Sequence, residues 1–285
     1  MSAIPPPDRN LTLVSSEPHA LEIVAPARIA LLVEDVGVRK CALPLMQTLT
    51  LAVLAGAFIA LGAMFYTVTI TGSELGFGPT RLIGGLAFSL GLVLVVVGGA
   101  ELFTGNSLIV MAWADGHVAS GRVLRNWALV YLGNLAGALG MVVLVHLAGT
   151  MSIGAASVGA TAKAIAEAKV TLTPLEGFVR GILCNLLVCL AIWMCFAAHS
   201  VPGKVVAIVF PISAFVALGF EHSVANMYLI PIGTLQNGST IGVADFLANL
   251  LPVTAGNIFG GGVLVAPVYW LVYLRDAAHP RGEGR

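Results

Sequence analysis

Two ionisable residues, Glu221 and His222, stand side by side inside an apolar stretch that covers residues 204–232. An ionisable side chain near the centre of a bilayer costs about 2.5–3.5 kcal/mol on insertion scales, so its presence points to function. Histidine has an unperturbed pKa of about 6.5, and in a narrow pore its ring could pass a proton to the anion of a weak acid. The alternative is a buried structural histidine that is satisfied by Glu221.

An earlier stretch of the chain repeats this pattern. The glycine, the glutamate and the asparagine recur at identical spacing: Gly99, Glu101 and Asn106 match Gly219, Glu221 and Asn226. A second set recurs in the same order: Asn126, Gly133, Asn134 and Gly137 match Asn249, Gly256, Asn257 and Gly260. Two matched sets indicate an internal duplication, which is common among transporter folds.

The composition is that of a protein that crosses a lipid bilayer several times. Of the 285 residues, 58% are hydrophobic and 10% are charged, and the formal net charge is zero. The absence of a basic or acidic surplus gives no reason to expect a nucleic-acid partner. The four cysteines have neither metal-site spacing nor the pattern of a disulfide framework. We therefore predict neither a metal site nor a cofactor.

Six runs are long enough to cross a bilayer, which takes about 20 residues: residues 43–70, 82–112, 123–149, 174–198, 204–232 and 248–274. The second and fifth runs contain the polar inserts around Glu101 and Glu221. Because unpaired backbone is costly in hydrocarbon, such inserts must be buried in protein or line a watery cavity. The prediction is an all-α polytopic protein in which the second and fifth helices are broken and face one another across a pathway.

The distribution of lysine and arginine outside these runs predicts the orientation. With the N-terminus inside, the inner segments hold Arg9, Arg28, Arg39, Lys40, Arg122, Arg125, Lys204, Arg275, Arg281 and Arg285, and the outer ones hold Arg81, Lys163 and Lys169. Both termini should therefore be cytoplasmic. Three helices per repeat then give the two halves opposite orientations.

The ends of the chain have a different character from the spans. Residues 1–20 read as a disordered cytoplasmic tail, and residues 21–42 alternate apolar and charged positions, which is typical of an amphipathic helix at the interface. An ordinary surface helix is the alternative. Residues 43–276 form the transport domain, and residues 277–285 a second cytoplasmic tail. Gating of flux by the amphipathic helix is a hypothesis that rests on its pattern alone.

The glutamates of the two inserts are expected to be structural. We expect Glu101 and Glu221 to accept hydrogen bonds from backbone N–H groups exposed at the helix breaks, with direct binding of protons or a cation as the alternative. The other polar residues of the inserts, Thr104 and Asn226 among them, join His222 as candidates for the pathway.

Two basic residues near the outer ends of the spans could meet an anion. Lys169 lies in a connector over residues 150–173 and could draw anions into an outer vestibule; the alternative is an ordinary solvated loop lysine. Arg180 follows Glu176 by one helical turn, a favourable acid-before-base pair. We expect Arg180 to snorkel toward the interface, with a role in the pore as the alternative.

Bulky and small residues mark two other features of the spans. Phe88 and Leu92 lie one turn apart in the second run and Phe215 lies in the fifth, where they could form apolar constrictions, although such spacing is more typical of core residues. The glycine pairs 133/137 and 256/260 predict close-packed helix seams.

Several segments together resemble the formate/nitrite transporter family. They are Gly99–Asn106, Gly219–Met227, Asn185–Trp193 and Leu251–Ile258. The resemblance covers about residues 25–276. It implies a homopentamer of aquaporin-like protomers, each with its own pore, in a prokaryotic inner membrane.

The resemblance also implies roles for individual residues. His222 would be the central histidine, with Thr104 and Asn226 near it, and Lys169 would be the vestibule lysine. The remaining positions would form two constrictions, an outer one from Phe88 and Phe215 and an inner one from Leu92, Val188 and Asn185. Arg180 departs from the family's formate channels, in which this position is apolar.

Residues 227–233 and 269–275 look more like formate channels than like nitrite or hydrosulfide members. The expected function is therefore passage of small monovalent anions, formate first, by a channel or a proton-coupled mechanism. Nitrite or hydrosulfide is the alternative substrate. An intramembrane enzyme would need a second histidine or a nucleophile facing His222, and His146 lies near the end of the third run, so we predict no enzyme activity. Two interrupted spans at matching positions argue against a scaffold.

Overall fold

The structure is a computed structural model that describes residues 24–275. The predicted tails, residues 1–20 and 277–285, lie outside the described residues. Within residues 24–275 every regular element is helical. Six segments are long and apolar enough to cross a membrane, as predicted: α2 (Leu45–Ile70), α3 (Phe77–Gly98), α5 (Ser120–Leu147), α7 (Pro174–Ala197), α8 (Val201–Leu218) and the composite span of α10 (Val243–Phe259), η3 (Gly260–Val265) and α11 (Ala266–Tyr273).

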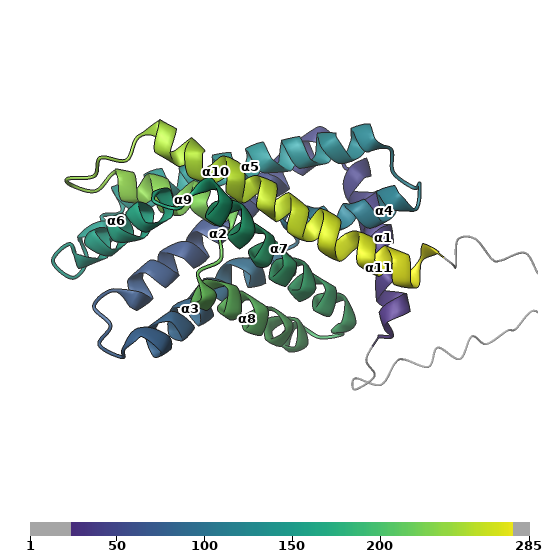
Figure 1. The fold of residues 1–285 in the computed structure, drawn as a ribbon, viewed down its shortest axis with the longest axis horizontal. Helices are drawn as coiled ribbons and strands as arrows, with labels where there is room; N and C mark the ends of the chain where they lie inside the picture. The colour runs from purple at the N-terminus through teal and green to yellow at the C-terminus, as the bar shows by residue number, and fades with distance from the viewer. Residues whose placement is uncertain (1–23, 276–285) are drawn as a thin grey trace, which may run out of the picture.

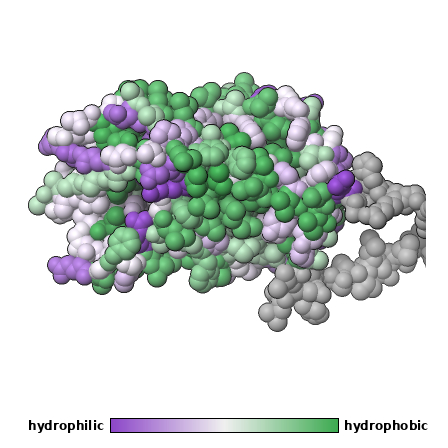
Figure 2. All heavy atoms as spheres, viewed as in Figure 1, coloured by the Kyte–Doolittle hydropathy of each residue, from purple (hydrophilic) through white to green (hydrophobic). Residues whose placement is uncertain are grey.

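The helices form two similar halves. The first contains α1 (Pro26–Ala42) with α2, α3 and α5, and the second contains α6 (Ser157–Val170) with α7, α8 and α10. Helix α2 packs against both α3 and α5, and α7 packs in the same way against both α8 and α10. In Figure 1, α1 and α11 lie at one end of the molecule and α6 at the other. These are called the α1 end and the α6 end below. Figure 2 shows a mostly apolar surface between the two ends, with polar residues gathered toward each.

The second and fifth spans are broken where the sequence predicts. Helix α3 ends at Gly98, and the chain resumes with η1 (Gly105–Ile109) and α4 (Val110–Ala114). Helix α8 ends at Leu218, and the chain resumes with α9 (Ser223–Thr234). Each break starts with a glycine in the left-handed region, Gly99 at φ +77° and Gly219 at φ +74°. Residues with a Cβ rarely adopt this conformation, so the glycines permit both breaks.

The glycine pairs form the predicted seams. A Cβ on Gly137 of α5 would lie 2.0 Å from the Val53 carbonyl oxygen of α2, and one on Gly256 of α10 would lie 2.1 Å from the Phe178 carbonyl oxygen of α7. Backbones can approach this closely only when the side chain is missing. The same kind of contact thus joins the first and third spans of each half.

Two features of the secondary structure were not predicted from the sequence. The connector over residues 150–173 contains the helix α6, preceded by η2 (Thr150–Ser152). Its many alanines are strong helix formers, and its buried face, with Ala162 and Ala166, packs against α9. The last span is also not a continuous α-helix, because three successive glycines begin the π-helical segment η3. Such a segment is an expected place for a change in helix geometry.

Candidate functional site

His222 lies at the start of α9 and contacts the other broken span. Its side chain is buried, and Nε2 lies 3.0 Å from the Thr104 hydroxyl oxygen. The other ring nitrogen, Nδ1, accepts a hydrogen bond from the Ala225 N–H (3.0 Å) and so caps the first turn of α9. A nitrogen that accepts cannot carry the ring proton of a neutral histidine. The proton therefore resides on Nε2, which donates to Thr104.

Three polar residues, Lys169, Asn226 and Asn249, form a network with the carboxylate of Glu221, next to His222. Lys169 Nζ donates to both oxygens of Glu221, at 2.9 and 3.1 Å. Asn226 Nδ2 donates to Glu221 (2.7 Å) and to Asn249 Oδ1 (2.8 Å). Asn249 Nδ2 in turn donates to the backbone carbonyl of Lys169 (2.8 Å), which closes the ring. Lys169 is thus held beside Glu221 and is mostly buried, so it is not an ordinary solvated lysine.

The first half contains the same network. Lys40 Nζ donates to Glu101 (2.8 Å) and to Asn106 Oδ1 (2.9 Å). Asn106 Nδ2 donates to Glu101 (2.7 Å) and to Asn126 Oδ1 (2.9 Å), and Asn126 Nδ2 reaches the Lys40 carbonyl (3.3 Å). The internal duplication seen in the sequence is therefore also a duplication of hydrogen bonds.

A further asparagine in each half satisfies the backbone at the breaks. Asn134 accepts from the Phe103 N–H (2.9 Å) and donates to the carbonyls of Ala52 (2.8 Å) and Glu101 (2.9 Å). Two main-chain groups of the irregular segment and one of α2 thereby gain partners. This is necessary at the break because an unpaired buried group costs about 1–3 kcal/mol.

Asn257 makes the matching bonds in the second half. It accepts from the Ser223 N–H (2.9 Å) and donates to the carbonyls of Gly181 (2.8 Å) and Glu221 (3.0 Å). The prediction that backbone N–H groups at the breaks donate to the carboxylates of Glu101 and Glu221 is therefore wrong. Asparagine side chains take up the backbone groups, and the carboxylates bind lysine and asparagine side chains instead.

A pocket of about 360 Å³ opens near the α6 end. Its lining includes Lys169, His222 and the aromatic residues Phe88 and Phe215. The two phenylalanine rings meet edge to face with centroids 5.5 Å apart, and the Phe215 ring lies nearly parallel to the His222 ring at 6.0 Å. The residues that the resemblance assigns to an outer constriction thus stand beside the histidine.

Two arginines also line this pocket. Arg81 donates to the carbonyls of Ala217 (2.5 Å) and Val216 (3.1 Å), and Arg180 donates to that of Gly219 (3.4 Å). Cations are favourable at this place because the C-terminus of α8 is the negative end of its helix dipole. Arg180 also pairs with Glu176 (3.8 Å), as predicted from their spacing.

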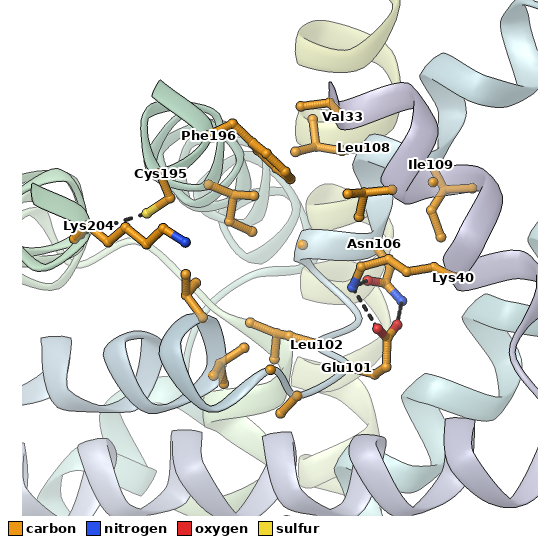
Figure 3. Close-up of a pocket in the computed structure, with 18 residues that line it drawn as sticks. Val33, Lys40, Glu101, Leu102, Asn106, Leu108, Ile109, Cys195, Phe196 and Lys204 are labelled. Atoms are coloured by element: carbon orange, nitrogen blue, oxygen red, sulfur yellow. Dashed lines mark hydrogen bonds and ion pairs between the residues drawn. The ribbon is translucent and has the colours of Figure 1, made fainter. Parts of the chain in front are cut away.

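A second pocket, of about 270 Å³, opens near the α1 end. Lys40 and Lys204 both line it, and Figure 3 shows their ammonium groups reaching toward the space from opposite sides. Lys40 is paired with Glu101, whereas Lys204 forms no ion pair with any carboxylate among residues 24–275. The chain therefore has a cationic pocket at each end.

The residues that the resemblance assigns to the inner constriction are buried near the centre. Leu92 and Val188 belong to the apolar core together with Phe88 and Phe215. Asn185 is fully buried, and its Nδ2 donates to the Ser107 hydroxyl (3.1 Å) and to a backbone carbonyl of α10 (2.6 Å). Its amide thus joins segments from both halves.

Sequence reasoning did not place Lys40, Lys204 and Arg81 at the two pockets and counted them only toward orientation. For Lys40 a signal exists, because it stands four residues before Pro44, close to where Lys169 stands before Pro174. Each lysine ends a helix that leads into a span. The duplication therefore extends to the helices that precede the first span of each half.

The fold and the site define a class, a helical membrane protein whose two halves repeat one hydrogen-bonded helix break around a buried polar pair. The chain matches the formate/nitrite transporter family over residues 27–271 and belongs to it. Its family and relatives are channels and transporters, so the protein is a transport protein and not an enzyme.

Similar proteins cover nearly the whole chain. The formate channel FocA of Escherichia coli strain K12 is 42% identical over 280 residues, which is 92% of this chain and 98% of that protein. A probable formate transporter of Methanothermobacter thermautotrophicus is 41% identical over 250 residues, 82% of this chain and 91% of the relative. A solved pentameric formate channel with formate bound superposes with a TM-score of 0.75 at 40% identity, covering 81% of this chain and 98% of that one.

Proposed function

We propose that each protomer conducts small monovalent anions, formate first, between the two pockets. The observation that carries the proposal is the position of the Thr104–His222 pair. His222 lines the α6-end pocket, whereas Gly105 and Asn106, which follow Thr104 in the chain, line the α1-end pocket. The pair thus stands between two cationic pockets, and the similar formate channels favour formate as the substrate.

Charge selects the substrate at the entrances. Lys169 with Arg81 and Arg180 at one end, and Lys40 with Lys204 at the other, raise the local concentration of anions. Apolar side chains, Phe88 and Phe215 among them, then oppose further entry of a charged species, because desolvating an ion without a partner is very costly. A weak-acid anion overcomes this barrier by taking up a proton, which makes it neutral.

The geometry favours protonation of the substrate on its approach. Transfer from His222 as an imidazolium would require a proton on Nδ1 and would break the hydrogen bond from the Ala225 N–H. It would also place a positive charge at the N-terminus of α9, where the helix dipole is unfavourable for cations. In our proposal His222 stays neutral and offers Nε2–H, with the Thr104 hydroxyl, as the polar contact at the centre of the pathway.

The proposal extends to the oligomeric state and to the orientation of the protein in the membrane. The structural relative is pentameric, so we propose a homopentamer with one pathway in each protomer. The excess of basic residues around α1 favours a cytoplasmic position for the α1 end and for both termini. The membrane would be a prokaryotic inner membrane. The amphipathic face of α1 would lie at its cytoplasmic interface, and Lys169 would then face the outside.

The proposal is tested by uptake of formate, nitrite and hydrosulfide into proteoliposomes, with lumenal pH recorded. Native protein and His222→Asn are compared, and His199→Ala, which changes an exposed histidine, is the matched control. We expect formate flux with proton movement in the native and control proteins and a strong loss in His222→Asn. Equal flux in all three proteins would reduce His222 to a structural residue. A preference for nitrite or hydrosulfide would assign the protein to another substrate of the family.

A further inference from the structure

Two carboxylates and an imidazole meet at the α1 end, away from the proposed transport pathway. Glu34 lies on α1, and Asp115 and His117 lie in the turn between α4 and α5. His117 Nε2 is 3.4 Å from Glu34 Oε1 and 3.3 Å from Asp115 Oδ2. All three ligand atoms lie within 4.8 Å of one another. This cluster could not be predicted from the sequence, because Glu34 is far from the other two residues along the chain.

Glu34 has a buried oxygen without a partner. Its side chain is 9% exposed, and Oε1 accepts no hydrogen bond from any of the described residues. The contacts from His117 Nε2 do not meet hydrogen-bond geometry. A buried carboxylate oxygen that points at an imidazole nitrogen and at a second carboxylate lacks compensation for its lost hydration. An ion placed between the three groups would supply it.

The two other ligands are held in place. Trp270 Nε1 of α11 donates to Asp115 Oδ1 (2.9 Å), which leaves Oδ2 turned toward His117. The His117 N–H donates to the Ala112 carbonyl (2.9 Å), and Gly116 at φ +82° allows the tight turn between them. Such outer hydrogen bonds typically orient the ligands of metal sites. Figure 1 shows α1, α4 and α11 together at this end of the molecule.

The spacing suits a specific kind of ion. Zinc binds imidazole nitrogen and carboxylate oxygen at about 2.0–2.2 Å, and a tetrahedron then places ligand atoms about 3.3–3.6 Å apart. Both distances from His117 fall in this range. An imidazole ligand favours zinc and related transition metals over magnesium and calcium. His117 is 57% exposed, so an ion can enter from solution and keep a water as its fourth ligand.

We propose that Glu34, Asp115 and His117 bind a divalent transition-metal ion that fastens α1 to the turn between α4 and α5. An ion bound to Glu34 would also affect the α1-end pocket. Val33, Val36, Gly37 and Lys40 of the same helix line the α1-end pocket. A bound ion therefore fixes the helix that forms one wall of that pocket.

The charges around Glu34 suit a cation. The fold brings the carboxylates of Glu34 and Asp115 together beside one imidazole. A dication would neutralise both carboxylates, whereas His117 carries at most one positive charge.

The test measures zinc binding to the purified full-length protein in detergent, by metal analysis after gel filtration and by calorimetry, with magnesium in excess. We expect one zinc per protomer in the native protein and in His199→Ala, the matched exposed histidine. Glu34→Gln and His117→Ala should each weaken binding by at least about 10- to 100-fold, the range seen even for outer-shell changes. Cobalt should show the visible absorption of a tetrahedral site in the native protein and lose it in His117→Ala.

Two results would overturn the proposal. Equal zinc binding by His117→Ala would place the metal elsewhere on the chain. No zinc bound by the native protein would mean that the three side chains form an ion pair only. Native elution as an assembled oligomer shows that each variant is folded, and both changes are mild, since Gln matches Glu in shape and His117 is exposed.

Discussion

The two helix breaks use one hydrogen-bonding scheme, and they differ at the residues that face the centre. Each has a lysine, a glutamate and two asparagines at equivalent distances. The residue after the glutamate is Leu102 in the first half and His222 in the second. Three residues after the glutamate stand Thr104 and Val224, respectively. The repeated residues stabilise the two breaks. Of the residues that differ, Thr104 of the first half and His222 of the second contact one another.

A second difference concerns the lysines. Lys40 divides its hydrogen bonds between Glu101 and Asn106 Oδ1, whereas Lys169 gives both to Glu221. Asn226 Oδ1 is therefore buried without a donor among residues 24–275. The α6-end network has one connection fewer than its counterpart, and its lysine depends on a single carboxylate.

The largest expected effect is the loss of that carboxylate. Glu221→Ala leaves the mostly buried Lys169 without an acceptor, and breaking a buried pair in this way costs about 3–5 kcal/mol. Glu101→Ala should cost about 1–2 kcal/mol less, because Lys40 keeps its bond to Asn106 and is more exposed. Thermal unfolding of the two purified variants, followed side by side, measures the difference. Equal losses would mean that the extra hydrogen bond of Lys40 has no energetic weight.

The helix seams should be nearly as sensitive, and equally so in both halves. Gly137→Ala and Gly256→Ala each force a Cβ against a backbone oxygen, which costs about 3 kcal/mol at the upper end of the usual range for overpacking. Gly140→Ala, on the same helix as Gly137, is the control, because nothing lies within 4 Å of its added Cβ. Unfolding temperatures of the three variants test this. A seam variant as stable as Gly140→Ala would show that the helices can separate without loss.

The sequence predicted much of this symmetry because each repeated residue has a local function. Gly99 and Gly219 allow the left-handed turn, and the paired glycines allow close packing of helices. The residue type itself therefore predicts the local geometry. The Ala-rich α6 was missed because its chain resembles a flexible connector in composition, and its helical state depends on packing against α9.

The donors to the carboxylates could not be predicted in the same way. Lys40 and Glu101 are 61 positions apart, and nothing in local spacing brings them together. Arg81 likewise reaches carbonyls of α8 that are about 135 positions away, and a bond to a main-chain oxygen leaves no trace in the partner's residue type. Side-chain contacts between distant segments follow from the tertiary fold.

A smaller effect should distinguish the chemistry of the centre from its packing. Thr104→Val keeps the shape of the side chain but removes the acceptor for His222 Nε2–H, whereas Thr104→Ser keeps the hydroxyl. Loss of one hydrogen bond is worth about 0.5–1.5 kcal/mol, so formate flux should fall about 2- to 10-fold in Thr104→Val. Uptake into proteoliposomes measures it. Native flux in Thr104→Val, with a loss in Thr104→Ser, would assign the position to packing alone.

The smallest expected effect on stability is that of Arg180, which lines the α6-end pocket together with Arg81. Arg81 holds two carbonyls at the end of α8, so Arg81→Leu should lower stability by about 1–3 kcal/mol. Arg180 makes one long hydrogen bond and its side chain is 40% exposed, so Arg180→Leu should change stability by no more than about 0.5 kcal/mol.

The main effect of Arg180→Leu should instead be on the binding of formate at the entrance. Removing a pocket cation weakens attraction for the anion, and we expect the half-saturating formate concentration to rise about 2- to 5-fold, which corresponds to less than about 1 kcal/mol. Maximal flux should be unchanged or higher, because a weaker site releases its anion more readily. Concentration series of formate uptake, compared for the native protein and Arg180→Leu, measure both quantities. An unchanged half-saturating concentration would mean that Arg180 only contacts the Gly219 carbonyl and Glu176 and does not attract the anion.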